Sequence, residues 1–184
     1  MRNDLPLINV YKKASVKAEI VTQILYGDTF KIIKQKGSWV KIKNDIDHYK
    51  GFIKKKKFPK NQKNTHKVCN LRASLYLKPN VRSKIKKKLS FASKIKVIKR
   101  NNGFYKFENL WIKKEDLKEI KYKTKNIFKN IKKFTNIKYK WGGKHFSGVD
   151  CSALIQLFFN FNNKFCPRDT KDQIKYFKKK IKLK

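Results

Sequence analysis

The stretch Tyr139-Lys140-Trp141-Gly142-Gly143, followed by Gly148-Val149-Asp150-Cys151-Ser152-Ala153-Leu154, is the most informative part of this 184-residue sequence. Its glycines indicate a loop, and the apolar residues that come after Cys151 have helical spacing. The loop should therefore deliver Cys151 to the first turn of a helix. Unpaired backbone N–H groups and the helix dipole favour a thiolate at such a position, and a thiolate is a nucleophile.

A purely structural role for Cys151 is also compatible with these residues, because a small buried cysteine on an amphipathic helix gives the same pattern. Cys69 and Cys166 are expected to be structural. Three cysteines are an odd number, which argues against a disulfide framework. No paired Cys and His spacing indicates a zinc site, so no metal and no other cofactor is predicted.

A repeat occupies the first two thirds of the chain. Residues 25–33 align with residues 90–98, and Gly51-Phe52-Ile53 aligns with Leu110-Trp111-Ile112. Short apolar runs between turn signals predict small antiparallel β-barrels, and a repeat of this size predicts two copies of one module. The expected modules are residues 1–60 and 65–119, and the charged segment 54–64 would link them.

The last third of the sequence changes to helical spacing, which gives an α+β fold. Ile127, Phe128, Ile131 and Phe134 fall on one face of a predicted helix. After the Cys151 helix, Thr170-x-x-Gln173 is expected to form a capping box that opens a final helix. Ile174, Phe177 and Ile181 would face the core from that helix. Residues 122–184 are the predicted third domain.

The motifs of this last third resemble a known family. Tyr-x-Trp-Gly-Gly, Gly-x-Asp-Cys-Ser-x-Leu and Pro-Arg-Asp-Thr-x-x-Gln occur in the order and spacing of the NlpC/p-sixty family of cell-wall cysteine peptidases, over residues 127–181. Residues 47–53, Asp-His-Tyr-Lys-Gly-Phe-Ile, resemble the closing strand of the bacterial Src-homology-3-type domains that precede the catalytic domain in many members. The resemblance implies two such modules, then the helical front half of a papain-like cysteine-peptidase domain.

The resemblance also implies a reaction, the hydrolysis of the γ-D-glutamyl–diaminopimelate bond in peptidoglycan (murein) peptides. Cys151 would be the nucleophile, and Asp150 and Tyr49 would bind the free amine of the peptide's L-Ala. Tyr139, Ser152 and Thr170 would surround the D-Glu carboxylate. The sequence departs from the family pattern at two positions. Ala153 stands where a Gly is usual, and Thr170 stands where a Ser is more common.

The base of such an enzyme is the part that the sequence does not provide. A cysteine hydrolase needs a base, which in this family is a His after the cysteine helix, and no His follows Cys151. The expectation is a chain that stops before the catalytic His. His145 is the candidate base within the chain, and an exposed loop residue is the alternative interpretation. The missing half could be a separately encoded partner, the chain could be a fragment, or it could be a relative that binds wall peptides without cutting them.

The net charge of +38 is very high for this length. A polyanion partner would explain it, and so would an AT-rich coding sequence, because Lys, Ile, Asn, Phe and Tyr are all abundant. Lys is spread along the chain and outnumbers Arg, which does not favour a specific nucleic-acid site. Non-catalytic binding of murein peptides or wall polymers, and basic nucleic-acid binding, remain the alternatives to a peptidase.

The expected compartment follows from what the sequence does not show. No apolar stretch is long enough for a signal peptide or a membrane span. The prediction is the cytoplasm, with a role in murein recycling. The periplasm or the cell wall is the alternative.

Overall fold

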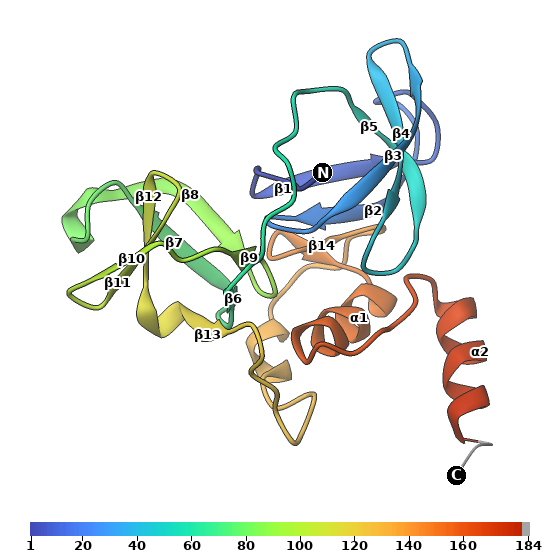
Figure 1. The fold of residues 1–184 in the computed structure, drawn as a ribbon. Coiled ribbons are helices and arrows are strands. Elements are labelled where there is room, and N and C mark those ends of the chain that lie inside the picture. The colour runs from blue at the N-terminus through green and yellow to red at the C-terminus, as the bar shows by residue number, and fades with distance from the viewer. Residues whose placement is uncertain (182–184) are drawn as a thin grey trace.

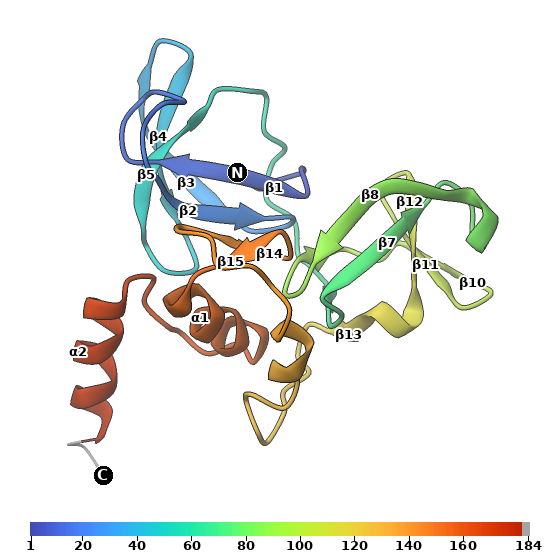
Figure 2. The same cartoon turned by 180° about the vertical axis from the view of Figure 1, so that it is seen from behind.

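The computed structural model describes the backbone of residues 1–181 and the side chains of residues 1–178. Figures 1 and 2 show two β-sheet regions and a part with two helices that lies against the first of them. We call these the first β-region (residues 7–54), the second β-region (residues 66–119) and the helical part (residues 122–181). The predicted sheet-rich architecture that ends in helices is confirmed.

The first β-region is an open antiparallel sheet of five strands in the order β2-β1-β5-β4-β3. Its core consists of side chains from every strand and Phe58 from the segment that follows, namely Val10, Ile24, Phe30, Val40, Ile42, Ile53 and Phe58. The strands are β1 Leu7–Tyr11, β2 Ile20–Leu25, β3 Phe30–Lys36, β4 Trp39–Asn44 and β5 Lys50–Lys54.

The second β-region holds a five-stranded sheet in the order β10-β11-β12-β7-β8 and a three-stranded sheet in the order β13-β6-β9. Read in reverse, the larger sheet has the strand order of the first β-region, with β7 in the place of β1. Its strands are β6 His66–Val68, β7 Arg72–Tyr76, β8 Lys84–Ser90, β9 Lys94–Ile95, β10 Lys99–Asn101, β11 Phe104–Phe107, β12 Leu110–Lys113 and β13 Leu117–Glu119. Two 3-10 turns, Val81–Ser83 and Lys114–Asp116, complete the region.

One turn has the same geometry in both β-regions. Gly27 (φ 80°) and Ala92 (φ 67°) occupy the same left-handed position. The next residue donates its N–H to the carbonyl three residues earlier in both copies, from Asp28 in the first and from Ser93 in the second, at 3.1 Å each. Local chemistry therefore produces the same bend twice.

The predicted closure of the two barrels is wrong. Strands β2 and β3 are the two ends of the first sheet, and β8 and β10 are the two ends of the larger second sheet. Every residue of β3 after Phe30 is exposed, and Lys31, Lys34 and Lys36 are among them. Lysines along an edge strand oppose pairing with a further strand, so the sheets stay open.

The helical part contains a short hairpin and two helices. The hairpin, β14 Lys144–His145 with β15 Gly148–Val149, lies inside the stretch that was predicted to be a loop. Helix α1 spans Cys151–Phe161, as predicted, and α2 spans Thr170–Ile181. Within residues 1–181, neither helix has the length and hydropathy that crossing a bilayer requires.

The helix predicted over residues 127–134 is wrong, because only a 3-10 turn forms there, at Ile131–Phe134. The Asn126 side chain accepts a hydrogen bond from the Phe128 N–H at 2.9 Å. Such a local bond competes with the helical pattern. The apolar spacing still has a consequence, since Phe128 and Phe134 both pack against Phe158 of α1, with ring centroids 5.7 and 5.3 Å apart.

The start of α2 also differs from the prediction. Gln173 does not complete a capping box, because its amide donates to the carbonyls of Ser152 and Pro167 at 2.8 and 2.9 Å. Ile174 is 50% exposed and does not face the core, whereas Phe177 packs against Phe159. The side chain of Ile181 lies outside the described residues.

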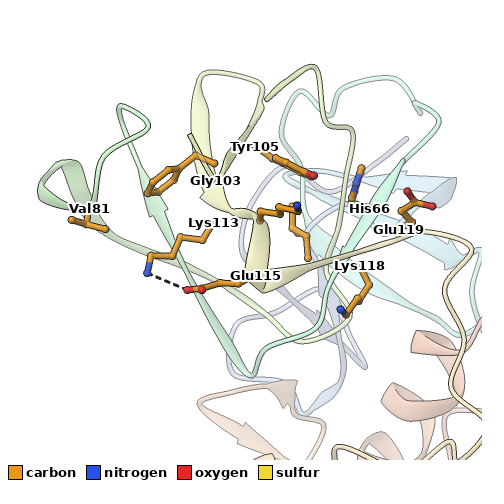
Figure 3. Close-up of a pocket in the computed structure, with 11 residues that line it drawn as sticks. His66, Val81, Gly103, Tyr105, Lys113, Glu115, Lys118 and Glu119 are labelled. Carbon is orange, nitrogen blue, oxygen red and sulfur yellow. Dashed lines mark hydrogen bonds and ion pairs between the residues drawn. The ribbon is translucent and has the colours of Figure 1, made fainter. Parts of the chain in front are cut away.

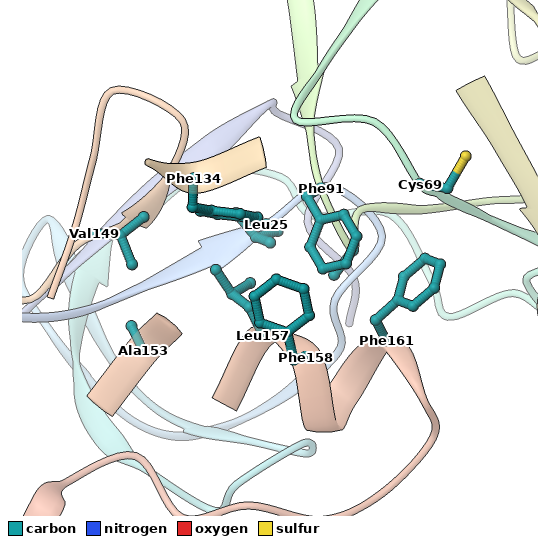
Figure 4. Close-up of a cluster of buried hydrophobic side chains, with 10 residues drawn as sticks. Leu25, Cys69, Phe91, Phe134, Val149, Ala153, Leu157, Phe158 and Phe161 are labelled. Atoms are coloured by element: carbon teal, nitrogen blue, oxygen red, sulfur yellow. The ribbon is translucent and has the colours of Figure 1, made fainter. Parts of the chain in front are cut away.

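One core joins all three parts (Figure 4). Phe91 of the second β-region stacks on Phe161 of α1 with ring centroids 4.6 Å apart, and Leu25 of the first β-region joins the same cluster. Full burial of each such side chain contributes about 2–3 kcal/mol. The other buried members are Cys69, Ala92, Phe134, Val149, Ala153, Leu157 and Phe158.

Candidate active site

Cys151 is the first residue of α1 and is exposed. Asp150 caps the helix, with extended backbone angles (φ −90°, ψ 170°), and its Oδ1 accepts the Ala153 N–H at 2.8 Å. The Asp150 carbonyl accepts the Leu154 N–H at 3.0 Å. The predicted position of Cys151 in the first turn of a helix is confirmed. The thiol stands where backbone N–H groups favour negative charge.

The loop before α1 is pressed against the first β-region at Gly142. This residue has φ +71°, and a Cβ atom there would lie 2.2 Å from the carbonyl oxygen of Ile20. No side chain fits such an approach. The Gly142 N–H donates to Asp150 Oδ2 at 2.9 Å, which ties the loop to the helix cap.

A buried ion pair lies at the residue that precedes Cys151. Arg168 donates from NH2 to Asp150 Oδ2 at 2.6 Å and from NH1 to Asp150 Oδ1 at 3.0 Å. Its NH1 also reaches Ser152 Oγ at 2.9 Å, and its Nε donates to Thr22 Oγ1 of β2 at 2.8 Å. A bidentate pair of this kind fixes geometry as well as charge.

This network occupies two of the predicted site residues. Burial alone would raise the pKa of Asp150, but the hydrogen bonds and charge of Arg168 and the bonds from Ala153 and Ser152 hold it below its ordinary value. Ser152 Oγ donates to Asp150 Oδ1 at 3.1 Å. Both side chains are buried, and both accept hydrogen bonds from the Arg168 guanidinium.

The thiol opens into a cavity of about 440 Å³ between the first β-region and the two helix starts. Of the predicted binding residues, Tyr49, Tyr139 and Thr170 line this cavity with Cys151, and so do parts of Asp150 and Ser152. Thr170 Oγ1 lies 4.0 Å from Cys151 Sγ, so the starts of both helices meet at the thiol. Tyr139 is 65% exposed at the cavity rim.

Two carboxylates of the cavity were not predicted as binding residues. Glu19 accepts hydrogen bonds from the Trp141 indole at 2.7 Å and from Lys12 at 3.0 Å, and these bonds lower its pKa. Asp169 accepts a hydrogen bond from Tyr49; burial and that carboxylate raise the pKa of Tyr49 to about 12. Glu19 has no local signal in the sequence. Asp169 had one, its place in the Pro-Arg-Asp-Thr motif, although it was interpreted as structural.

A second, apolar cavity of about 180 Å³ lies on the other side of Cys151. Its apolar walls are Phe134, Ile137, Val149 and Leu154, and it shares Tyr139, Asp150 and Cys151 with the first cavity. The thiol therefore stands on the border between a polar and an apolar surface.

The structure does not bring a histidine to the thiol within residues 1–178. His145 lies in β14, where its Nδ1 is 2.9 Å from Ser147 Oγ, and burial lowers its pKa to about 4. His48 is exposed in the loop before β5, and His66 lines a cavity of the second β-region. None of the three lines either cavity at Cys151.

Comparisons with known proteins match two segments of the chain, one in the first β-region and one in the helical part. Residues 6–57 match the bacterial SH3 domain, and residues 136–184 match the NlpC/P60 family. A gamma-D-glutamyl-L-lysine dipeptidyl-peptidase from Bacillus cereus (strain ATCC 10987 / NRS 248) is 23% identical over 84% of this chain. The chain spans about half the length of that relative, 54%.

A solved structure has the same fold. The crystal structure of an NlpC/P60 family protein from Bacillus cereus ATCC 10987 superimposes with a TM-score of 0.80, at 17% sequence identity, over 94% of this chain and 75% of that chain. This protein thus combines a segment similar to the bacterial SH3 domain with a carboxy-terminal segment similar to the NlpC/P60 family.

Proposed function

We propose that this protein acts on cell-wall peptides as a cysteine peptidase, with Cys151 as the nucleophile. The observation that carries the proposal is the exposed thiol at the start of α1, inside a cavity that is also lined by carboxylate and hydroxyl groups. The match to the NlpC/P60 family supports it. The proposed bond is the one after γ-D-glutamate, with diaminopimelate or lysine as the next residue.

The cavity suggests how a free peptide amine would be held. Glu19, Asp169 and the Tyr49 hydroxyl line one cavity, and carboxylates are the natural partners of an ammonium group. We assign the amine to this group rather than to Asp150, because the bonds from Arg168 to Asp150 are buried, whereas the bonds that Glu19 accepts from Lys12 and Trp141 are exposed and open to exchange. Tyr49 keeps its proposed role.

The D-Glu carboxylate is proposed to lie in the same cavity, near Tyr139 and Thr170. Two helix starts meet there, and helix N-termini bind anions. Ser152 would contribute by holding Arg168 in place. The N–H groups of the first turn of α1 would stabilise the oxyanion of the tetrahedral intermediate.

The proposed reaction also requires a base. The thiolate attacks the γ-carbonyl, the C–N bond breaks, and the amine leaves with a proton; water then hydrolyses the thioester. A base must first accept the thiol proton, and no His of residues 1–178 lines the cavities. A separately encoded half that supplies this base remains a proposal. The compartment is also a proposal. The domain limits at residues 1–60, 65–119 and 122–184 are proposals as well, and the shared strand order of the two β-regions supports them.

The test is mass spectrometry of L-Ala–γ-D-Glu–diaminopimelate, and of its lysine counterpart, after incubation with the full chain. We expect the wild type to release L-Ala–γ-D-Glu on its own or when imidazole is added as an external base, and Cys151→Ala to release none. Iodoacetamide should label Cys151 alone, because Cys69 and Cys166 are buried. Equal release by Cys151→Ala would overturn the assignment of the nucleophile.

Non-catalytic binding of wall peptides is the second candidate, and the cavity without a histidine favours it. Saturable binding of the tripeptide, with no product even in imidazole, would establish it. Binding to nucleic acid is distinguished by a steep loss of affinity with added salt and little base preference.

A further inference from the structure

The two β-regions differ in what they bring to Cys151. The second one has a cavity of about 680 Å³, which runs between His66 and the Lys113–Glu115 ion pair (Figure 3). None of the residues that line this cavity lines either cavity at the thiol. The first β-region does contribute to the wall at Cys151, through Tyr49 among others. Residues that hold Tyr49 in place can therefore influence the proposed reaction without lining its cavity.

Tyr49 is held at two points, and Asp47 provides the first of them. The Tyr49 N–H donates to Asp47 Oδ1 at 3.0 Å, within the loop that joins β4 to β5. The Tyr49 hydroxyl donates to the carboxylate of Asp169, directly before α2. The position of the Tyr49 side chain in the cavity therefore depends on where Asp47 holds its backbone.

The second oxygen of Asp47 binds the helix that carries the nucleophile. Gln156 of α1 donates from Nε2 to Asp47 Oδ2 at 3.0 Å and to the Cys166 carbonyl at 3.0 Å. Gln156 is fully buried and lies on the same helix as Cys151. One carboxylate therefore connects the backbone of Tyr49 to α1. Asp47 lines neither cavity at the thiol, so it acts on this site through Tyr49.

A buried ammonium group gives the charge of Asp47 a function. Lys144 of β14 is 1% exposed, and among the side chains that the structure describes its Nζ has no hydrogen-bond partner. Burial lowers the pKa of Lys144, and the charges of Asp47 and then of Asp28 oppose that decrease. A buried cation needs a nearby anion. An amide at residue 47 could still accept the Tyr49 N–H, but it would supply no charge for Lys144 and only one oxygen for two donors.

We propose that Asp47 is a positioning residue that holds Tyr49 at the amine end of the substrate by fixing its loop to α1, with Lys144 as the buried counter-ion. The inference rests on the proposed function, because it takes Tyr49 as a ligand of the free peptide amine. A residue that only shaped its own turn could be replaced by Asn, which accepts the same local hydrogen bond. Asp47 joins the loop to α1 and lies near the charge of β14, so Asn should not replace it.

A matched pair of ligands isolates the amine in the test. They are L-Ala–γ-D-Glu–diaminopimelate and its propionyl analogue, in which hydrogen replaces the amine. The full chain with Cys151→Ala is labelled with 5-fluorotryptophan, and fluorine NMR follows the signal of Trp141, which lines the cavity. We expect both ligands to move this signal, and the tripeptide to have the lower dissociation constant. The ratio of the two dissociation constants is the amine preference.

Asp47→Asn should reduce the amine preference about fivefold, the equivalent of roughly one hydrogen bond, because it weakens binding of the tripeptide but not of the analogue. Tyr49→Phe should reduce the preference directly. Gln156→Leu should reduce it as well, and the double variant with Asp47→Asn should lose no more than Asp47→Asn alone, because both changes break one link. Asp45→Asn, at an exposed carboxylate of the same loop, is the matched control and should leave the preference unchanged.

The outcomes separate this inference from the proposed function. An amine preference that Asp47→Asn does not change would overturn the inference, since Asp47 would then only shape its turn. Equal weakening of both ligands would also overturn it, because the effect would not pass through the amine. Iodoacetamide should label Cys151 of Asp47→Asn at the wild-type rate; a changed rate would indicate a general structural role and exclude positioning. A tripeptide that does not move the Trp141 signal before Asp47 is changed would overturn the proposed function, and this inference with it.

Discussion

The two β-regions share one strand order, yet each joins the helical part through a different buried cation. At the first region the helical part supplies the cation, Arg168, which pairs with Asp150 and reaches Thr22 of β2. At the second region the sheet supplies it, since Lys67 of β6 donates to the carbonyls of Ile120, Tyr122 and Phe161. We call these two contacts the first and the second joint. The first joint is the Arg168–Asp150 ion pair next to Cys151. In the second joint the Lys67 ammonium donates to neutral carbonyl groups, and one of them, Phe161, ends α1.

The two regions therefore share a strand order but not the contact by which they hold the helical part. Single side chains at their edges decide that contact. The first region borders the Cys151 cavity, and the second carries a cavity of its own.

Loss of Arg168 should have the largest effect on stability. Arg168→Met leaves the Asp150 carboxylate buried without a cation, and such losses cost about 3–5 kcal/mol. Urea unfolding of the variant should show this decrease in the free energy of unfolding. Arg82→Met, at an exposed arginine of the second region, is the control and should change stability little. A decrease below about 1 kcal/mol would show that the first joint does not depend on the ion pair.

The repeated turn offers a matched pair of substitutions. Gly27→Ala places a Cβ 1.9 Å from the Lys94 carbonyl oxygen at positive φ, so we expect a loss of about 3 kcal/mol from backbone strain and overpacking. Ala92→Gly, at the equivalent position, should change stability by less than about 1 kcal/mol, because relief of strain offsets the added chain entropy and the lost burial of one methyl group. Equal effects in thermal unfolding would contradict the difference between the two turns.

Acid should loosen the hairpin that contacts both regions. His145 has its pKa lowered from 6.5 to about 4, so below pH 6.5 the unfolded chain binds a proton that the folded chain does not. The contribution of His145 to the free energy of unfolding is fully present above pH 6.5. It is lost as the pH falls towards 4, and the loss is about 3 kcal/mol in total. Urea titrations at pH 7 and pH 4.5 should show this decrease, and His145→Gln should reduce it. An unchanged pH slope in the variant would exclude His145 as its source.

Loss of Lys67 should have the smallest effect of the four. Lys67→Met leaves three carbonyl groups without their donor but also removes a buried charge, so the net loss should be about 2 kcal/mol. Hydrogen exchange should increase at the last turn of α1 rather than at its first. Lys86→Met, at an exposed lysine of β8, is the control. A loss as large as that of Arg168→Met would mean that the two joints are energetically alike.

The sequence predicted what local chemistry determines. The helix start at Cys151 depends on residues close together in the chain, and so does the likeness between residues 25–33 and 90–98. The Arg168–Thr22 and Trp141–Glu19 contacts join residues 146 and 122 positions apart, and no local pattern reports them. The helix expected at residues 127–134 failed because periodicity does not register the competing Asn126 bond. The prediction of closed barrels failed because closure depends on whether the edge strands pair with each other, and the pattern of apolar runs does not describe that pairing.

The close approach of Gly142 to Ile20 has a consequence for how parts of this protein can be exchanged. The wall of the Cys151 cavity is shared between backbone atoms of two distant segments, and the fit leaves no room for a side chain. Another β-region could replace the first one only if its backbone approached Gly142 as closely as Ile20 does. In protein engineering the two segments should therefore be transplanted together as one unit.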